Sequence, residues 1–370
     1  MQRRTALGLI AATGAAASLA AVPAFGAQTS RADATGPATA AGGYTFPLNR
    51  NVDRTPVRFT NRYGIELAAD LYVPKNARGK LRALALSGPF GAVKEQASGL
   101  YANEFARRGY AALAFDPSFT GQSGGTVRDV GSPDINTEDW SAAVDFLGLQ
   151  DIVDRERIGA QAICGLSGMA LTAAAADSRI KAVATAAMYD MSRAMSRGHE
   201  DYYTPEQRHK VVDHLSRQRW IDAENGTYAR LSAEVPFDEN GDVAPTDRVL
   251  PERLPEDADP ITAMFFDYYR TERGYHPRSI NSTTAWTGTT PMSFFAFGQV
   301  TNIGMLAPRK ALLVTGSEAH SRYYSQDVQA MAPDTIDLLT VPGADHVDLY
   351  DRTDIIPFDE LDAFFTHNLA

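Results

Sequence analysis

The chain has 370 residues and is acidic, with 35 Lys and Arg residues against 45 Asp and Glu residues and a formal net charge of −10. This charge argues against a nucleic-acid partner. The single cysteine excludes an intramolecular disulfide and a cysteine-based zinc cluster. The length suits one large domain with an insertion, or two modest domains.

The first residues resemble a twin-arginine export signal. Arg3 and Arg4 precede a weakly apolar run that has no acidic residue before Asp33. We predict a signal peptide over residues 1–26 and a disordered, Ala/Thr/Gly/Ser-rich leader over residues 27–43. Because the run is too weakly hydrophobic to anchor the chain, we expect export to the periplasm or the medium without stable membrane insertion after signal removal.

Further along the chain, short apolar runs alternate with helical patterns, which predicts an α/β fold with a mostly parallel sheet. The predicted strands cover residues 57–60, 66–73, 81–86, 111–115, 158–163, 180–187, 311–315 and 336–341. The predicted helices cover residues 96–108, 137–149, 165–176, 325–331 and 357–368.

The alternation stops in the middle of the chain, and residues 235–260 carry five prolines and are predicted to be a loop. We therefore predict one α/β core, formed by residues 44–190 and 306–370, that is interrupted by a cap of residues 191–305. The last two strand–helix pairs are too few for a second, independent core.

The most informative stretch is IGAQAICGLSG, residues 158–168, where a strand runs directly into a helix. This pattern is typical of a nucleophile elbow, a crowded turn that needs small neighbours. Counting from the strand places Cys164 at the nucleophile position, with Ala162 as a small neighbour and Leu166 as a departure. Ser167 is the alternative nucleophile, but it requires a strand three residues longer. A helix N-terminus and a nearby histidine would favour a thiolate.

The catalytic base of such a fold follows the nucleophile in the chain and lies after the last strand, where this chain has His346. The acid that orients the base usually follows the preceding strand. There the loop has Ala319 at the usual position and Glu318 one residue earlier, so we predict Glu318, with Asp190 as the alternative. His320 is a minor candidate for the base.

An oxyanion hole needs two backbone N–H groups, one from the residue after the nucleophile and one from the loop after the third strand. We predict Gly165 and Phe90 for these positions. Pro89 is excluded because proline has no N–H group.

With these residues placed, the chain resembles the α/β-hydrolase group that includes the YcjY-like proteins and is related to the X-Pro dipeptidyl peptidase and dienelactone hydrolase families. The matching stretches include GPFGAVKEQASGLYANEFARRGY, ICGLSGMAL and PGADHVDLYDR. The elbow of this group, Gly-Ile-Cys-Gly-x-Gly-Gly, matches at Cys164, Gly165 and Gly168 and departs at Ala162 and Ser167. The resemblance implies an α/β-hydrolase fold with an eight-stranded, mostly parallel sheet and a cap inserted between strands 6 and 7.

Together these features predict a hydrolase that cleaves a carboxylic ester or lactone of a small molecule through a Cys-His-acid triad and an acyl-enzyme. A peptidase, an acyltransferase and a non-catalytic binding protein with a degenerate site remain alternatives, and the oligomeric state stays open. No metal or organic cofactor is implied. The predicted cap contributes aromatic residues that would set substrate size, and four arginines that would attract an anionic group: Arg197, Arg270, Arg273 and Arg278.

Overall fold

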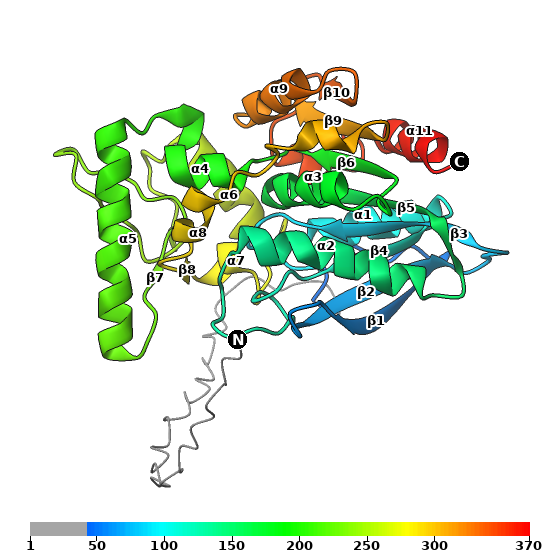
Figure 1. The fold of residues 1–370 in the computed structure, drawn as a ribbon, viewed down its shortest axis with the longest axis horizontal. Helices are drawn as coiled ribbons and strands as arrows, with labels where there is room; N and C mark the ends of the chain where they lie inside the picture. The colour runs from blue at the N-terminus through cyan, green and yellow to red at the C-terminus, as the bar shows by residue number, and fades with distance from the viewer. Residues whose placement is uncertain (1–42) are drawn as a thin grey trace, which may run out of the picture. The chain divides into compact units, whose positions relative to one another are not determined.

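A computed structural model describes residues 43–370 of the chain (Figure 1). The predicted signal peptide and all but the last residue of the predicted leader lie outside the described residues. Across the described part of the chain, no helix has both the length and the apolar character needed to cross a bilayer.

An eight-stranded sheet forms the centre of the fold, in the order β1-β2-β4-β3-β5-β6-β9-β10. The first pair is an antiparallel hairpin, β2 pairs antiparallel with β4, and every later pairing is parallel. The predicted mostly parallel sheet is thus confirmed. The strands are Val52–Thr60 (β1), Glu66–Pro74 (β2), Leu81–Ser87 (β3), Ala111–Phe115 (β4), Val153–Ile163 (β5), Ala182–Ala186 (β6), Lys310–Gly316 (β9) and Ile336–Val341 (β10).

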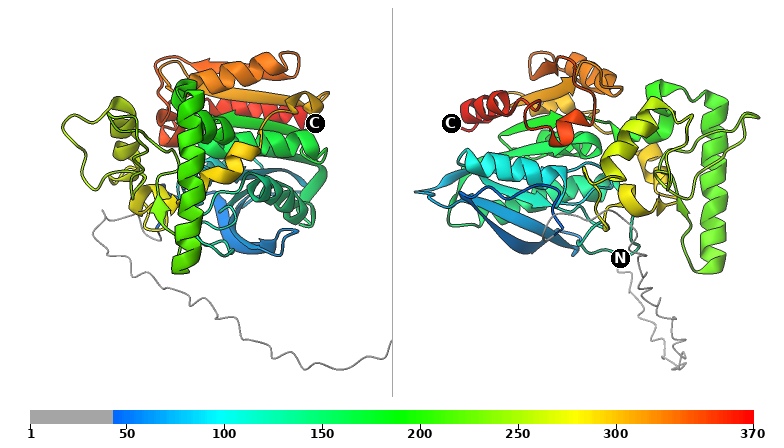
Figure 2. Two further views of the ribbon diagram at one scale, coloured as in Figure 1. Left: turned by 60° about the vertical axis from the view of Figure 1, so that its left-hand side comes forward. Right: turned by 180° about the vertical axis from the view of Figure 1, so that it is seen from behind.

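Helices cover both faces of the sheet, because its central strands are apolar on both sides. In β3, Ala83 and Ala85 join one hydrophobic core cluster, whereas Leu84 and Leu86 join the cluster on the opposite face. Figure 1 shows α2 and α3 in front of the sheet, and the right panel of Figure 2, which is seen from behind, shows α1 and α11 on the opposite face. The core helices are Ala97–Arg107 (α1), Pro133–Gly148 (α2), Ser167–Ala176 (α3), Arg322–Met331 (α9), Asp348–Asp351 (α10) and Phe358–Asn368 (α11).

Three predicted boundaries were wrong by four or five residues, and one of them is the start of β1, which begins at Val52 rather than at residue 57. Helix α2 begins at Pro133 rather than at residue 137, because proline fits the first helical position and Ser132 precedes it with extended dihedral angles. Strand β5 begins at Val153 rather than at residue 158. Its first half is charged and partly exposed, and a register shift against β3 separates it from the buried half, so it lacks the apolar signal of a strand.

The segment between β6 and β9, the sixth and seventh sheet strands in chain order, leaves the α/β pattern. We call residues 187–309 the cap segment; Figures 1 and 2 show its helices gathered at one end of the sheet. Its longest helix, α5, begins with a reciprocal capping box between Thr204 and Gln207. Its elements are Met191–Arg197 (α4), Pro205–Asn225 (α5), Arg230–Leu231 (β7), Pro260–Tyr269 (α6), Ile280–Thr283 (α7), Trp286–Thr287 (β8) and Pro291–Ala296 (α8).

Candidate active site

Cys164 lies on a strained turn between β5 and α3. Its backbone φ is +55°, in the left-handed region that residues with a side chain rarely adopt. The chain makes one 3-10 turn over Cys164–Leu166 before α3 begins at Ser167. The backbone N–H of Tyr189, just beyond β6, donates a 3.1 Å hydrogen bond to the carbonyl oxygen of Cys164. The turn thus raises Cys164 above the carboxyl edge of the sheet, as a nucleophile elbow does.

The neighbours of Cys164 explain why the turn tolerates a leucine. A Cβ atom at Gly165 would lie 2.6 Å from Cβ of Phe90 and 2.7 Å from Sδ of Met191, so this position requires glycine. Leu166, the departure from the usual pattern, is 1% exposed and belongs to the core cluster on the α2 and α3 face. The small residue that the turn needs is therefore Gly165, while Leu166 contributes to the core.

Ser167, the alternative nucleophile, is the first residue of α3 and is fully buried. Its hydroxyl group has no hydrogen-bond partner in the described part of the chain, and the residue does not line the cavity described below. The structure therefore gives Ser167 neither a base nor access to a substrate.

The sulfur of Cys164 has three polar neighbours. The backbone N–H groups of Gly165 and Phe90 and the hydroxyl group of Tyr350 are within hydrogen-bonding reach of it, and each lowers the thiol pKa. Burial outweighs all three and raises the pKa of Cys164 to about 11. Our expectation that the helix N-terminus would favour a thiolate was therefore wrong for the resting site, because desolvation dominates. Cys164 is a neutral thiol at neutral pH.

His346 is fully buried, and each of its two ring nitrogens forms a hydrogen bond with a hydroxyl group. Nε2 is 2.9 Å from Oη of Tyr350, and Nδ1 is 2.6 Å from Oγ of Ser321. Burial, reinforced by the neighbouring ring of His320, holds the pKa of His346 well below its usual value, so the imidazole is neutral. Tyr350, whose hydroxyl lies close enough to the Cys164 sulfur to lower the thiol pKa, is thus hydrogen-bonded to His346, and His346 is hydrogen-bonded to Ser321.

The structure does not bring either predicted acid to His346. The side chain of Glu318 is exposed, and its carboxylate accepts a 3.0 Å hydrogen bond from the Ser317 hydroxyl. Its backbone N–H bonds to the carbonyl of Ala344, which ties the two loops together and directs the side chain outward. Asp190 instead caps α4 by accepting from the N–H of Arg193. Ser321 occupies the place expected for the acid.

His320, the minor candidate for the base, lies beside the site and is not bonded to the thiol. Its Nε2 is 2.5 Å from Oη of Tyr189, and its ring centroid is 4.8 Å from that of His346. Burial and the nearby His199 lower the pKa of His320 to about 4. His320 is therefore a second neutral imidazole that packs beside His346.

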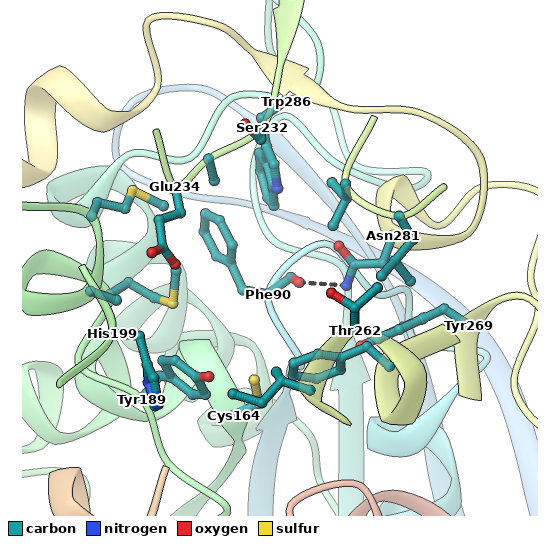
Figure 3. A pocket seen from close by; sticks show the side chains of 18 of the residues that line it. Phe90, Cys164, Tyr189, His199, Ser232, Glu234, Thr262, Tyr269, Asn281 and Trp286 are labelled. Carbon is teal, nitrogen blue, oxygen red and sulfur yellow. Dashed lines mark hydrogen bonds between the residues drawn. The ribbon is translucent and has the colours of Figure 1, made fainter. Parts of the chain in front are cut away.

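A cavity of about 510 Å³ opens above Cys164. Figure 3 shows the sulfur at one end of this cavity, with Phe90 above it and Tyr189 and His199 to one side. Every lining residue other than Phe90, Cys164 and Tyr350 comes from the cap segment. The apolar lining residues of the cap segment are Met191, Ala194, Met195, Ala233, Pro236, Val249, Leu250, Ile261, Phe265 and Trp286.

The cap segment also fixes the loop that carries Phe90. Asn281 Nδ2 donates a 2.8 Å hydrogen bond to the carbonyl oxygen of Phe90, drawn as a dashed line in Figure 3. Trp286 stacks on the Phe90 ring with centroids 3.9 Å apart and planes 18° apart. The N–H of Phe90 is thereby held in place by residues about 190 positions later in the sequence.

The cavity wall contains one histidine, His199, and two acids, Glu234 and Asp259; no lysine or arginine lines it. Asp259 is engaged as the N-cap of α6. Glu234 is open to the cavity, yet loss of surrounding water raises its pKa despite contacts from the His199 backbone and Tyr202. Figure 3 shows its carboxylate pointing into the cavity, across from Asn281.

None of the four arginines that we expected to attract an anionic group lines this cavity. Arg278 pairs with Glu95, Arg273 pairs with Asp351 and Asp267, and the guanidinium of Arg270 donates to backbone carbonyls. Arg197 is half exposed and lies 3.8 Å from Asp201. The expectation was wrong for this cavity because their partners hold these side chains away from its wall.

Sequence reasoning missed three residues of the site: Tyr350, Ser321 and Glu234. Tyr350 has a recognisable signal, because it follows His346 by four residues, the spacing of one helical turn, and α10 begins between them. Ser321 is two residues beyond the expected acid position and has no comparable signal. Glu234 lies in a segment without regular secondary structure, where the sequence pattern does not indicate a direction for the side chain.

Comparisons with known proteins agree with this fold. A sequence model of the X-Pro dipeptidyl-peptidase (S15) family matches residues 63–249. The chain is 53% identical to an uncharacterised Pseudomonas aeruginosa protein, PA2218, over 88% of this chain and 83% of that protein. It is 31% identical to the uncharacterised protein YcjY of Escherichia coli, over 80% of this chain and 92% of YcjY.

A shorter similarity, 33% identity over 36% of this chain and 42% of the relative, is to the thiohydrolase aneE of Aspergillus aculeatus. The crystal structure of PA2218 superposes with a TM-score of 0.81 at 52% identity, covering 88% of this chain and 96% of that one. The α/β hydrolase GrgF of Penicillium shares the fold, with a TM-score of 0.67 at 19% identity, covering 86% of this chain and 99% of GrgF.

Proposed function

The chain belongs to the X-Pro dipeptidyl-peptidase (S15) family of α/β hydrolases and is YcjY-like, and from this premise we propose that it cleaves ester-type bonds with Cys164 as the nucleophile. One observation carries the proposal. The sulfur stands on a positive-φ turn, between two backbone N–H groups, at the end of a cavity large enough for a small-molecule acyl group.

The chemistry follows from the positions of these groups. The sulfur attacks the carbonyl carbon of an ester, and the N–H groups of Gly165 and Phe90 stabilise the oxyanion. His346 accepts the thiol proton and returns it to the leaving alcohol. Because Cys164 is a neutral thiol and His346 a neutral imidazole at rest, the proton leaves the sulfur during the attack rather than before it. Water then hydrolyses the thioester.

The bond type is tested by trapping the intermediate. We expect p-nitrophenyl hexanoate to give a burst of p-nitrophenol and a protein mass increased by one hexanoyl group on Cys164, removable by neutral hydroxylamine. Because the family is named for peptidases and one relative is named a thiohydrolase, the panel includes X-Pro anilides and a hexanoyl thioester. Turnover confined to the anilides would replace the ester proposal, and an adduct on any other residue would contradict it.

We expect the hydroxyl group of Ser321 to contribute to turnover and the carboxylate of Glu318 to make no such contribution. Ser321→Ala removes the group bonded to Nδ1 of His346, and we expect kcat/KM for p-nitrophenyl hexanoate to fall about tenfold, the effect of about 1.4 kcal/mol in one hydrogen bond. Glu318→Ala, a control in the same loop, should stay within about twofold. The opposite order would restore Glu318 as the orienting acid.

The carboxylate of Glu234 is expected to select against anionic substrates. Two negative charges about 7 Å apart repel by about 2 kcal/mol at an effective dielectric constant near 20. We therefore expect Glu234→Gln to raise kcat/KM for p-nitrophenyl hydrogen adipate about tenfold, with p-nitrophenyl hexanoate, whose acyl chain has the same length, nearly unchanged.

The discrimination between these two esters should depend on pH in the wild-type protein. The pKa of Glu234 is raised by desolvation, so its charge, and with it the discrimination, disappears as pH falls through that raised pKa. Equal gains for both esters in the Gln variant would show that Glu234 acts on cavity shape instead of charge.

A further inference from the structure

His346 does not contact the nucleophile directly; a tyrosine stands between them. In the described residues both hydrogen bonds of the His346 ring go to hydroxyl groups, and Nε2, the nitrogen nearer the cavity, is bonded to Oη of Tyr350 at 2.9 Å. The same hydroxyl group lies beside the Cys164 sulfur in the cavity wall, where it lowers the pKa of the thiol. Tyr350 lines the cavity beside Cys164, whereas His346 does not.

We propose that Tyr350 is a proton-relay residue, whose phenol passes the thiol proton of Cys164 to His346 as the sulfur attacks. The inference rests on the proposed function, since it assigns the path of the proton in that reaction. It adds a catalytic group to the nucleophile and base, because Oη of Tyr350 touches the reacting sulfur.

The hydrogen-bond pattern suits this direction of transfer. With the proton of His346 on Nδ1 and donated to Oγ of Ser321, Nε2 is free to accept from the Tyr350 hydroxyl. The phenol oxygen then accepts from the S–H of Cys164. Every donor in the sequence Cys164, Tyr350, His346, Ser321 thus points to an acceptor, and the final acceptor is the Ser321 hydroxyl.

The step is balanced. The S–H bond breaks as the S–C bond to the substrate forms, and the carbonyl π pair moves to the oxygen held by Gly165 and Phe90. Oη of Tyr350 takes the proton from sulfur and releases its own proton to Nε2 of His346. The products are an oxyanion and an imidazolium, and Tyr350 ends as it began. A reversed relay then protonates the leaving alcohol.

Burial explains why a relay is required. Tyr350 and His346 are each 0% exposed, and burial raises the pKa of the phenol far above its usual value, so Tyr350 is not a base in its own right. It can exchange one proton for another without ever carrying a charge. The aromatic rings of Tyr189, Phe265 and Tyr268 surround Tyr350 and His346 and limit access of water, which would otherwise carry the proton.

Alkylation of the thiol tests the relay without a substrate. Cys164 is the sole cysteine, so iodoacetamide reports on it alone. In the wild-type protein, proton transfer to His346 should make the rate nearly independent of pH between about 6 and 8, above the lowered pKa of His346 and below the pKa of the thiol. In Tyr350→Phe, only the free thiolate reacts, so the rate should rise about tenfold per pH unit.

The matched control is Tyr324→Phe. Tyr324 is also buried, and it does not line the cavity. The control should keep the wild-type pH profile, and thermal unfolding of both variants checks that they fold. Tyr350→Phe should lower kcat/KM for p-nitrophenyl hexanoate about 100-fold, the low end for loss of acid–base catalysis.

A double variant separates a relay from a structural role. If Tyr350 acts only through His346, adding Tyr350→Phe to His346→Ala should change kcat/KM less than twofold. If the two residues act independently, the losses in kcat/KM of the two single variants should multiply. A wild-type alkylation profile in Tyr350→Phe would overturn the relay, whatever its effect on turnover. If the relay profile holds but no ester, thioester or anilide is cleaved, the proposed function fails while the relay stands.

Discussion

Cys164→Ala is expected to abolish ester hydrolysis, with a loss in kcat of at least about 10⁴-fold. The variant keeps the turn, because alanine adopts the same backbone with a smaller side chain, but it removes the atom that forms the acyl bond. Mutations of nucleophiles that act as part of a unit leave only the catalysis provided by binding and the oxyanion hole. The measurement is steady-state turnover of p-nitrophenyl hexanoate together with the burst amplitude.

The control for this variant lies three residues away. Ser167→Ala removes a hydroxyl that is buried, without a partner among the described residues, and outside the cavity wall, so turnover should remain within about twofold of wild type. If Ser167→Ala loses activity and Cys164→Ala retains it, the nucleophile is Ser167 and not Cys164. Cys164→Ser asks whether the site demands sulfur. We expect it to be nearly inactive, because a serine hydroxyl is far less acidic than a thiol and no carboxylate assists His346.

His346→Ala is expected to cost about 10³-fold in kcat/KM, within the 10² to 10⁴ range typical of a general acid–base residue. The imidazole is the one group connected to the thiol that is neutral and able to accept a proton at neutral pH. His367→Ala, in the exposed last turn of α11, is the matched histidine control and should leave turnover unchanged. Equal turnover in His346→Ala and His367→Ala would show that His346 takes no part in the reaction.

The pH dependence gives an independent test of His346. Burial lowers its pKa, so the imidazole remains unprotonated as the pH falls well below 6.5. We expect wild-type kcat/KM to stay high at pH 6 and to decline only as the pH passes through the lowered pKa of His346. A decline centred near 6.5 would indicate that the imidazole is hydrated in solution and not shielded as described.

Comparison of the predicted and observed elements shows which features of this fold are local. The buried runs of β3, β4 and β9 stand out because several consecutive residues are apolar, and burial on both faces of a parallel sheet requires that pattern. The start of α2 and the charged half of β5 were missed, because a proline cap and an exposed strand segment carry no periodic signal.

The sequence alone was sufficient to predict an α/β-hydrolase fold, a cysteine on the strand-to-helix turn and a histidine after the last strand. Each of these depends on neighbours within about ten residues: an apolar run, glycines that permit a tight turn, and chain order. Gly165 is only partly such a case, since the atoms that exclude a side chain there belong to Phe90 and Met191, which are distant in the sequence.

The tertiary structure decided what surrounds the sulfur. Whether Glu318 or Ser321 faces His346 depends on the path of a loop that a backbone hydrogen bond ties to Ala344, and the sequence pattern carries no information about that direction. Likewise, the neutral thiol results from burial beneath a segment far away in the chain, which outweighs the local effect of the helix N-terminus. Side-chain direction and desolvation are sums over distant neighbours, so folding has to bring those neighbours together before either is determined.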